Sequence, residues 1–168
     1  PAVTMLFSVV DEAEMANDVG PTDLLGLTTY VGPTSIEADV LDQGFVIRAR
    51  AIGRIEARVG GGGLGVNIGL LGAPNATFTV ADGGATHFDI TWLFTVRTPG
   101  SSGQLHCVVS AFSSTDQVTD LMPDASTGID TTAPVPVIPL ADMTEADPDN
   151  KVFLYSLQCE ILQPTPDP

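Results

Sequence analysis

The chain has 168 residues, a length that suits one domain with its own hydrophobic core. Its 21 acidic and 6 basic residues give a formal net charge of −15 at pH 7, which disfavours binding to nucleic acid phosphates and to anionic membranes. Apolar residues make up 43% of the chain, which argues against disorder throughout, and no apolar run has the length of a membrane span.

Short apolar runs separated by glycine and proline predict many strands and almost no helix. In chain order, the predicted strands cover residues 4–10, 45–59, 66–71, 76–80, 86–97, 104–112, 135–140 and 152–162. Prolines bracket the run 135–140, so this segment is expected to be an edge strand or an extended connector.

Alternation between apolar and polar residues is clearest in the strand 86–97. The apolar side of this strand comprises Phe88, Ile90, Trp92, Phe94 and Val96. A period of two is typical of a half-buried strand, because successive side chains point to opposite faces. The strand 45–59 also alternates, and Gly53 within it predicts a bulge or bend. In the strand 152–162, Phe153 and Tyr155 are expected to share the apolar face with Leu157.

About eight strands without crossover helices predict an all-β fold, an antiparallel β-sandwich that is jelly-roll-like. Residues 1–35 are expected to form an N-terminal strand and an extended acidic arm. Residues 36–162 should form the jelly-roll β-sandwich, with 113–134 as a polar surface loop. The Pro-rich residues 163–168 should form an extended C-terminal tail, because proline cannot continue a strand ladder.

None of the motifs of catalysis or cofactor binding fits its required context. Residues 60–65 satisfy G-x-G-x-x-G, but a β-like run follows instead of a helix, which predicts a flexible hairpin loop. Only His87 and His106 could serve a Ser-His-Asp arrangement, and no nucleophile motif accompanies them. Trp92 lies on an apolar strand face, so it is expected in the core and not as a sugar platform. We therefore predict no enzyme activity, no catalytic residues and no cofactor.

Two features leave alternatives open. Cys107 and Cys159 lie in separate apolar runs, and they could be buried thiols or form a single disulfide. Acidic residues gather in the segment 142–150, which could be a solvated loop or a weak calcium site, although the spacing is not that of an EF-hand. We predict no metal ligands.

Four of the six basic residues lie on one parity of a single predicted strand. They are Arg48, Arg50, Arg54 and Arg58. One hypothesis is a solvated strand face with local partners such as Asp39 or Asp89. The other is an interface with an acidic protein surface or a neighbouring subunit, since the planar guanidinium pairs well with carboxylates. These four arginines are the candidate interface residues.

A longer pattern of strand and turn residues runs along the chain from about residue 15 to 162. It begins with Ile36-Glu-Ala38, Leu41 and Gly44, and continues with the strand Ile47-Arg-Ala-Arg-Ala-Ile-Gly53. A second strand holds Trp92 and Thr95-Val-Arg-Thr98, followed by Gly100 and Gly103 in a turn, and an apolar strand from Phe153 to Leu162 closes the pattern. In these features the chain resembles small jelly-roll structural proteins of tailed bacteriophages.

The resemblance implies a non-enzymatic virion component, most simply a capsid decoration (cement) protein on the outer capsid surface. Such a protein would be a homotrimer, would bind the major capsid protein at threefold positions and would stabilise the shell. The alternative is a tail-fibre, baseplate or receptor-binding jelly roll. The sequence shows no repetitive or coiled-coil shaft, which favours decoration over a fibre, and the negative charge suits a surface that faces away from packaged DNA.

Overall fold

The computed structural model describes residues 3–9, 12–16, 18–72, 75–115 and 125–164, and it is all-β. A single 3₁₀ turn, η1 (Leu25–Leu27), accompanies fourteen strands in this described part. The strands are β1 (Val3–Val9), β2 (Ala13–Ala16), β3 (Thr22–Asp23), β4 (Tyr30–Val31), β5 (Ser35–Ile36), β6 (Val46–Glu56), β7 (Leu64–Leu70), β8 (Ala76–Val80), β9 (Ala85–Thr98), β10 (Gly103–Ser113), β11 (Ala125–Ile129), β12 (Val135–Pro136), β13 (Pro139–Met143) and β14 (Lys151–Leu162).

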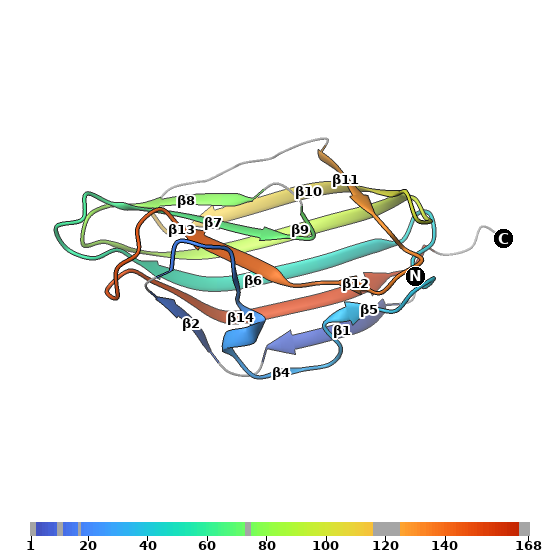
Figure 1. Ribbon diagram of the computed structural model, residues 1–168, viewed down its shortest axis with the longest axis horizontal. Coiled ribbons are helices and arrows are strands. Elements are labelled where there is room, and N and C mark those ends of the chain that lie inside the picture. Colours follow the sequence, from blue (N-terminus) through green and yellow to red (C-terminus); the bar gives the residue numbers. More distant parts are fainter. Residues whose placement is uncertain (1–2, 10–11, 17, 73–74, 116–124, 165–168) are drawn as a thin grey trace.

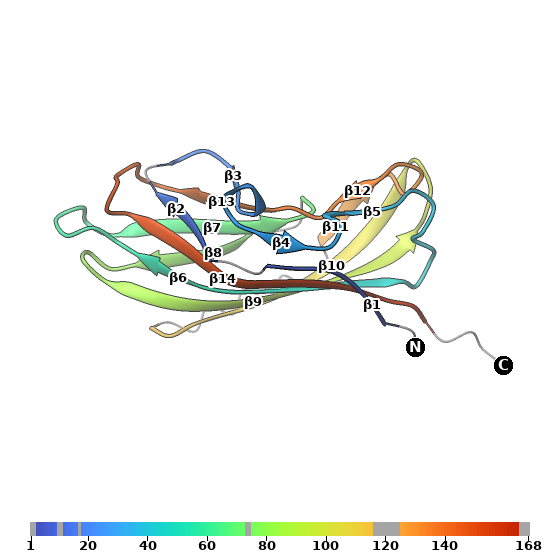
Figure 2. The same ribbon diagram turned by 90° about the horizontal axis from the view of Figure 1, so that it is seen from below.

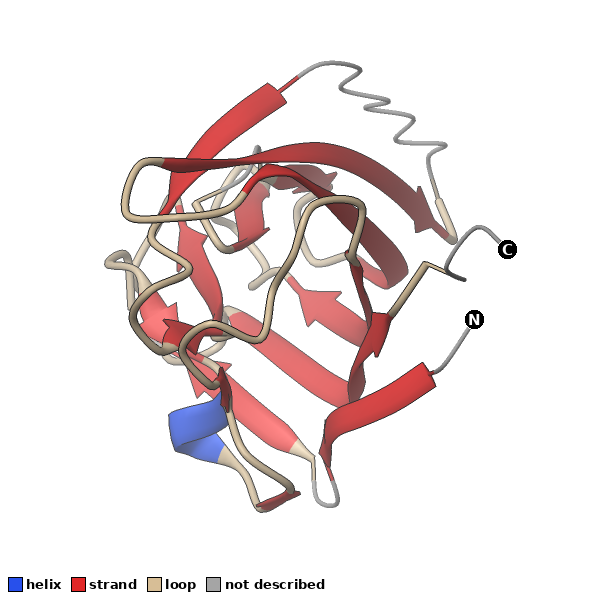
Figure 3. Ribbon diagram, turned by 90° about the vertical axis from the view of Figure 1, so that its right-hand side faces the viewer, coloured by secondary structure: helices blue, strands red, loops and turns tan. Residues whose placement is uncertain are grey.

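Two antiparallel layers build the sandwich (Figures 1 and 2). The large sheet has the order β11-β10-β9-β6-β14-β1-β4, with β2 also paired to β14. The small sheet has the order β3-β13-β7-β8, and β5 pairs separately with β12. Viewed along its length, the molecule shows strands arranged in a curled outline (Figure 3). The predicted antiparallel β-sandwich of jelly-roll type is confirmed, with more strands than the expected eight.

The core fills the space between the layers with apolar side chains from alternate positions of the long strands. Trp92 and Phe94 of β9 are fully buried there, as are Ile47 of β6 and Phe78 of β8. The prediction that Trp92 belongs to the core is therefore confirmed. Its indole nitrogen has no hydrogen-bond partner among the described residues. No helix in the described residues is long and apolar enough to cross a membrane.

The N-terminal segment is integrated into the sandwich, so the prediction of an extended arm is wrong for its described part. β2 pairs with β14, β3 with β13 and β4 with β1. Between the acidic residues lie Ala13, Met15, Leu24 and Leu25, which are all buried. The arm was predicted from the acidic composition of this segment. The free energy gained by burying its apolar side chains instead holds the segment against the sandwich.

Predictions for the segments 135–140, 113–134 and 60–65 also differ from the structure. Residues 135–140 split into β12 and β13, and β13 is an inner strand between β3 and β7, with Pro139 at its first position where proline is tolerated. The predicted loop 113–134 contains β11, whereas residues 116–124 lie outside the described residues. Residues 60–65 lie in the connection that leads from β6 of the large sheet to β7 of the small sheet, and the last two of them begin β7. Because β6 and β7 belong to different sheets, the connection is not the hairpin loop that the sequence predicted. Of the predicted tail, residues 165–168 lie outside the described residues.

Candidate interface on the outer face of the large sheet

Three of the four candidate arginines lie in a row on the solvent-facing side of β6. Arg48, Arg50 and Arg54 alternate with the buried Ile47, Ala49 and Ala51 on the same strand. β6 is flanked by β9 and β14, so each arginine has one neighbour on either side. The period of two in the sequence therefore places these guanidinium groups together on one sheet face.

Each arginine of this row is paired with a carboxylate of the same chain. Arg50 binds Asp89 of β9 in a bidentate manner, with Nε to Oδ1 at 2.9 Å and Nη2 to Oδ2 at 2.5 Å. Arg48 pairs with Glu160 of β14, and Arg54 pairs with Glu56 at 2.8 Å. Asp89 raises the pKa of Arg50 through this hydrogen bond and through its charge. Each positive charge of the row is therefore matched by a carboxylate. Asp89 is one of the two local partners that the solvated-face hypothesis named.

Arg58 is separated from the other three. It follows the end of β6, and its guanidinium turns toward the loop between β13 and β14, where it pairs with Glu145 and, at 3.2 Å, with Asp147. Its backbone N–H donates to Oδ1 of the buried Asn150 at 2.8 Å. Arg58 therefore ties together the loops at one end of the sandwich and does not extend the row.

Exposed apolar and aromatic side chains accompany the arginine row on the same sheet face. Leu93 of β9 is 38% exposed, Phe112 of β10 54% and Tyr155 of β14 39%. Tyr155 stacks near Phe153 and near His87, with ring centroids 6.4 Å apart in both cases. Together with the row of Arg48, Arg50 and Arg54, these three exposed side chains define what we call the outer patch.

Sequence reasoning missed half of the outer patch, and for Tyr155 a β-bulge explains why. The register between β14 and β6 shifts between Leu154 and Ser156, so one extra residue of β14 lies opposite β6. The bulge reverses the parity of the strand. Phe153 and Tyr155 therefore lie on the outer side, whereas Leu157 faces the core, so the prediction that all three share the apolar face is wrong. The exposure of Phe112 could have been predicted from the sequence. It lies two residues after the polar Ser110 on the same strand, so both side chains point to the same face.

A hollow of about 520 Å³ lies within the outer patch. The two ion pairs Arg48–Glu160 and Arg50–Asp89 form its walls, and Phe112 lines it as well. Its remaining lining residues are Thr91 and Gln158. The hollow thus offers guanidinium, carboxylate, amide and hydroxyl groups beside one exposed ring.

The acidic segment 142–150 comprises the end of β13 and a loop that carries hydrogen bonds of its own. Asp142 accepts a hydrogen bond from Asn67 at 2.8 Å, and Asp147 accepts one from the backbone of Asp149 at 2.9 Å. Asn150 donates to the carbonyl of Glu145 at 3.2 Å. Within the part of the chain that the structure describes, no three His, Cys, Asp or Glu side chains converge as metal ligands.

The two cysteines are buried and unbonded. Cys107 lies on β10 and Cys159 on β14, and the strands β9 and β6 separate them. Of the two alternatives that the sequence left open, the structure shows buried thiols. Burial raises the pKa of Cys107 to about 11 and that of Cys159 to about 12, so both stay protonated at neutral pH.

Comparisons with known proteins add little to this description. No protein family matches the chain, and no curated protein matches it. Among solved structures, arcelin-5, a lectin-like defense protein from Phaseolus vulgaris, is 9% identical with a TM-score of 0.36, over 96% of this chain and 99% of that one. The CBM2 module of the evolved Dit of Lactobacillus casei BL23 phage J-1 is 8% identical with a TM-score of 0.26, over 78% of this chain and 67% of that one. These scores are too low to carry an argument about function.

Proposed function

We propose that the chain is a non-enzymatic structural protein of a tailed-phage virion. It acts as a capsid decoration (cement) protein that binds the outer surface of the shell as a homotrimer and stabilises it. The outer patch carries this proposal, together with the resemblance of the sequence to phage jelly-roll proteins. The patch is a broad sheet face whose residue types are those of protein interfaces. The described residues form no converging set of metal ligands.

The composition of the outer patch matches that of protein interfaces. Interfaces are enriched in arginine and aromatic residues and depleted in lysine relative to the rest of the surface. Arg48 and Arg50 have 48% and 55% of their side chains exposed, so both keep donors for a partner beyond their carboxylates in this chain. Phe112 provides an apolar anchor beside them.

Stabilisation of a shell would follow from symmetric, repeated binding. A trimer with three equivalent patches engages several shell subunits at once, which raises the effective affinity without any new contact. A protein that binds only the expanded, assembled shell shifts the equilibrium toward that state. The formal charge of −15 would be repelled by packaged DNA, which suits an outward-facing position.

Co-sedimentation with emptied, expanded shells of the phage that encodes the chain tests this proposal, together with the mass of the protein in solution. We expect a trimer and saturable binding near one trimer per threefold position. Phe112→Asp should abolish shell binding while the fold survives, because the side chain is exposed. Val59→Asp is the matched control, since Val59 is 86% exposed in a loop outside the outer patch. A monomer that ignores the shells, or equal binding by both variants, would overturn the proposal.

The hollow favours a second candidate, a tail-fibre, baseplate or receptor-binding protein that recognises a host glycan. Polar groups at fixed positions beside an exposed ring can bind sugar hydroxyls and the apolar face of a sugar ring. This candidate predicts that the protein binds host cells or tails and leaves shells unbound. Gln158→Ala should then weaken cell binding, because it removes an amide from the hollow.

A further inference from the structure

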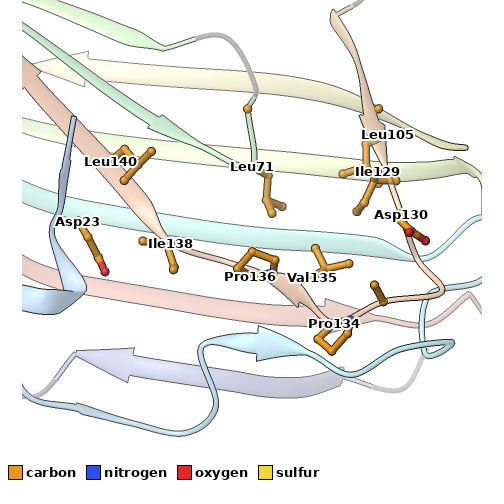
Figure 4. Close-up of a pocket in the computed structure, with 13 residues that line it drawn as sticks. Asp23, Leu71, Leu105, Ile129, Asp130, Pro134, Val135, Pro136, Ile138 and Leu140 are labelled. Carbon is orange, nitrogen blue, oxygen red and sulfur yellow. The ribbon is translucent and has the colours of Figure 1, made fainter. Parts of the chain in front are cut away.

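An apolar cleft of about 540 Å³ lies on the side of the small sheet and shares no residue with the hollow of the outer patch (Figure 4). Parts of β10, β11, β12 and β13 line it, together with the residues that follow β7. Its larger apolar side chains are Leu71, Leu105, Ile129, Pro134, Val135, Pro136, Ile138 and Leu140. Clefts of this size and composition hold small ligands or several side chains of a partner.

Two carboxylates flank the apolar floor. Asp23 and Asp130 lie at opposite ends of the labelled side chains in Figure 4, and no described residue that lines the cleft is basic. Asp130 accepts hydrogen bonds from the backbone and hydroxyl of Thr132 at 2.9 and 2.6 Å, which hold its pKa below the ordinary value. Asp23 accepts bonds from the backbone of Leu25 and Gly26 at 2.8 and 3.2 Å. The cleft is therefore apolar inside and negative at its ends.

The cleft also continues beyond the residues named above. A smaller hollow shares Leu71, Gly72, Ile138 and Leu140 with it and extends to Asn75. On another side, a hollow of about 400 Å³ shares Gly128, Ile129 and Asp130 with it and extends to Ser101 and Ser102. The cleft and these two hollows adjoin through shared lining residues, and we call the three together the trough.

One wall of the trough offers main-chain groups as well. β11 is the terminal strand of the large sheet and pairs only with β10 among the described residues, so its other edge has no strand partner there. An extended peptide can add to such an edge through main-chain hydrogen bonds, while alternate side chains enter neighbouring pockets.

We infer that this trough binds an extended apolar segment of another protein that carries at least one lysine or arginine. The apolar side chains of the segment fill the floor, its main chain runs along β11, and its cation lies near Asp23 or Asp130. The inference uses the opposite face from the outer patch and stands independently of the proposed function.

Selection of a random twelve-residue peptide library displayed on messenger RNA, against the immobilised full chain, tests this inference. We expect the enriched peptides to combine apolar residues with lysine or arginine. Binding of a synthetic copy should fall at least tenfold for Leu140→Ser, and at least tenfold for the double variant Asp23→Asn with Asp130→Asn. Both variants should fold, because Leu140 is 44% exposed and asparagine keeps the Oδ1 acceptor at each position.

Asp149→Asn is the matched control, since it removes one acidic charge without touching the trough, and it should leave binding unchanged. Amide exchange should slow at residues 127–129 when the peptide is bound. Peptides that bind all variants equally, enriched peptides without basic residues, or the absence of any enrichment would each overturn the inference. Binding of an apolar dye in the cleft without any peptide binding would also overturn it, in favour of a small apolar ligand.

Discussion

Among the described glycines, Gly53 leaves the least room for a side chain. A Cβ atom at this position would lie 2.0 Å from the carbonyl oxygen of Phe153 and 2.4 Å from the ring of Phe88. The sequence predicted a bulge or bend at Gly53 in its own strand, but β6 keeps an unbroken register with β9 there. The bulge lies instead in the neighbouring strand β14, between Leu154 and Ser156. Glycine thus allows β14 and the Phe88 ring to approach β6 more closely than any other residue would.

Gly53→Ala should destabilise the fold by about 3 kcal/mol or more, because both clashing groups are held by the sheet and by the core. Gly128→Ala is the control, since its added Cβ would meet no atom within 4 Å. Urea unfolding of both variants measures the difference. Equal midpoints for the two would show that β14 can move away at little cost.

Asp18 is held in its charged form by local hydrogen bonds. Its carboxylate accepts from the hydroxyl of Thr22 at 2.5 Å and from the backbone of Gly20 at 2.9 Å. These bonds lower the pKa of Asp18 from its ordinary value of 3.8. A lowered pKa in the folded state stabilises the fold above the unfolded pKa, and this stabilisation is lost as the pH falls through the folded pKa.

Asp18→Asn should therefore lower the melting temperature at pH 7, and the gap between variant and parent should close as the pH falls below about 4. Melting curves at a series of pH values measure this gap. Asp142→Asn serves as a comparison, because Asp142 lies on β13 and accepts its hydrogen bond from Asn67 on the neighbouring strand β7. A gap for Asp18→Asn that stays constant down to pH 2 would show that its effect does not come from the charge.

At the scale of elements, the long strands could be predicted and the short ones could not. β6, β9 and β10 alternate over eleven or more residues, which is enough for a period of two to show in the sequence. β3 and β4 have two residues each, which gives no period at all. The alternation also found the row of Arg48, Arg50 and Arg54. It could not find Tyr155, because the bulge that turns this ring outward depends on the register with β6.

The pairing of β6 with β9 places Arg50 beside Asp89, and from this ion pair we predict the effect of Arg50→Ala. Its bond to Asp89 lies on an exposed face, where ion pairs add little to stability. Arg50→Ala should therefore change the melting temperature by no more than about 2 degrees, yet it should weaken the binding of any partner that docks on the outer patch. Arg97→Ala, an exposed arginine near the end of β9, is the control for a lost positive charge. A large loss of stability in Arg50→Ala alone would make the pair structural.

At the scale of the whole molecule, most of the few basic side chains form ion pairs within the chain. Arg48, Arg50, Arg54, Arg58 and Lys151 all pair with carboxylates of the same chain. With 21 acidic residues in the sequence, most carboxylates have no cation to pair with, and the surface repels itself.

Sodium chloride should therefore raise the melting temperature at pH 7, because it screens this repulsion. The effect should shrink near pH 4, close to the sequence isoelectric point of about 4.1. Scanning calorimetry between 20 mM and 500 mM salt measures both conditions. A melting temperature that falls with salt at pH 7 would mean that the ion pairs outweigh the repulsion.

The pairing of β1 with β14 determines how the fold responds to mechanical force. Val3 lies opposite Leu162, so the start of β1 and the end of β14 are neighbours at one end of the sandwich. Tension that separates the two ends loads the hydrogen bonds between the strands one at a time, as in a zipper, instead of all together. β1 should peel away at low force, and β4, which pairs only with β1 among the described residues, would detach with it. β14 would keep its ladder with β6, so the molecule would lengthen before its core opens.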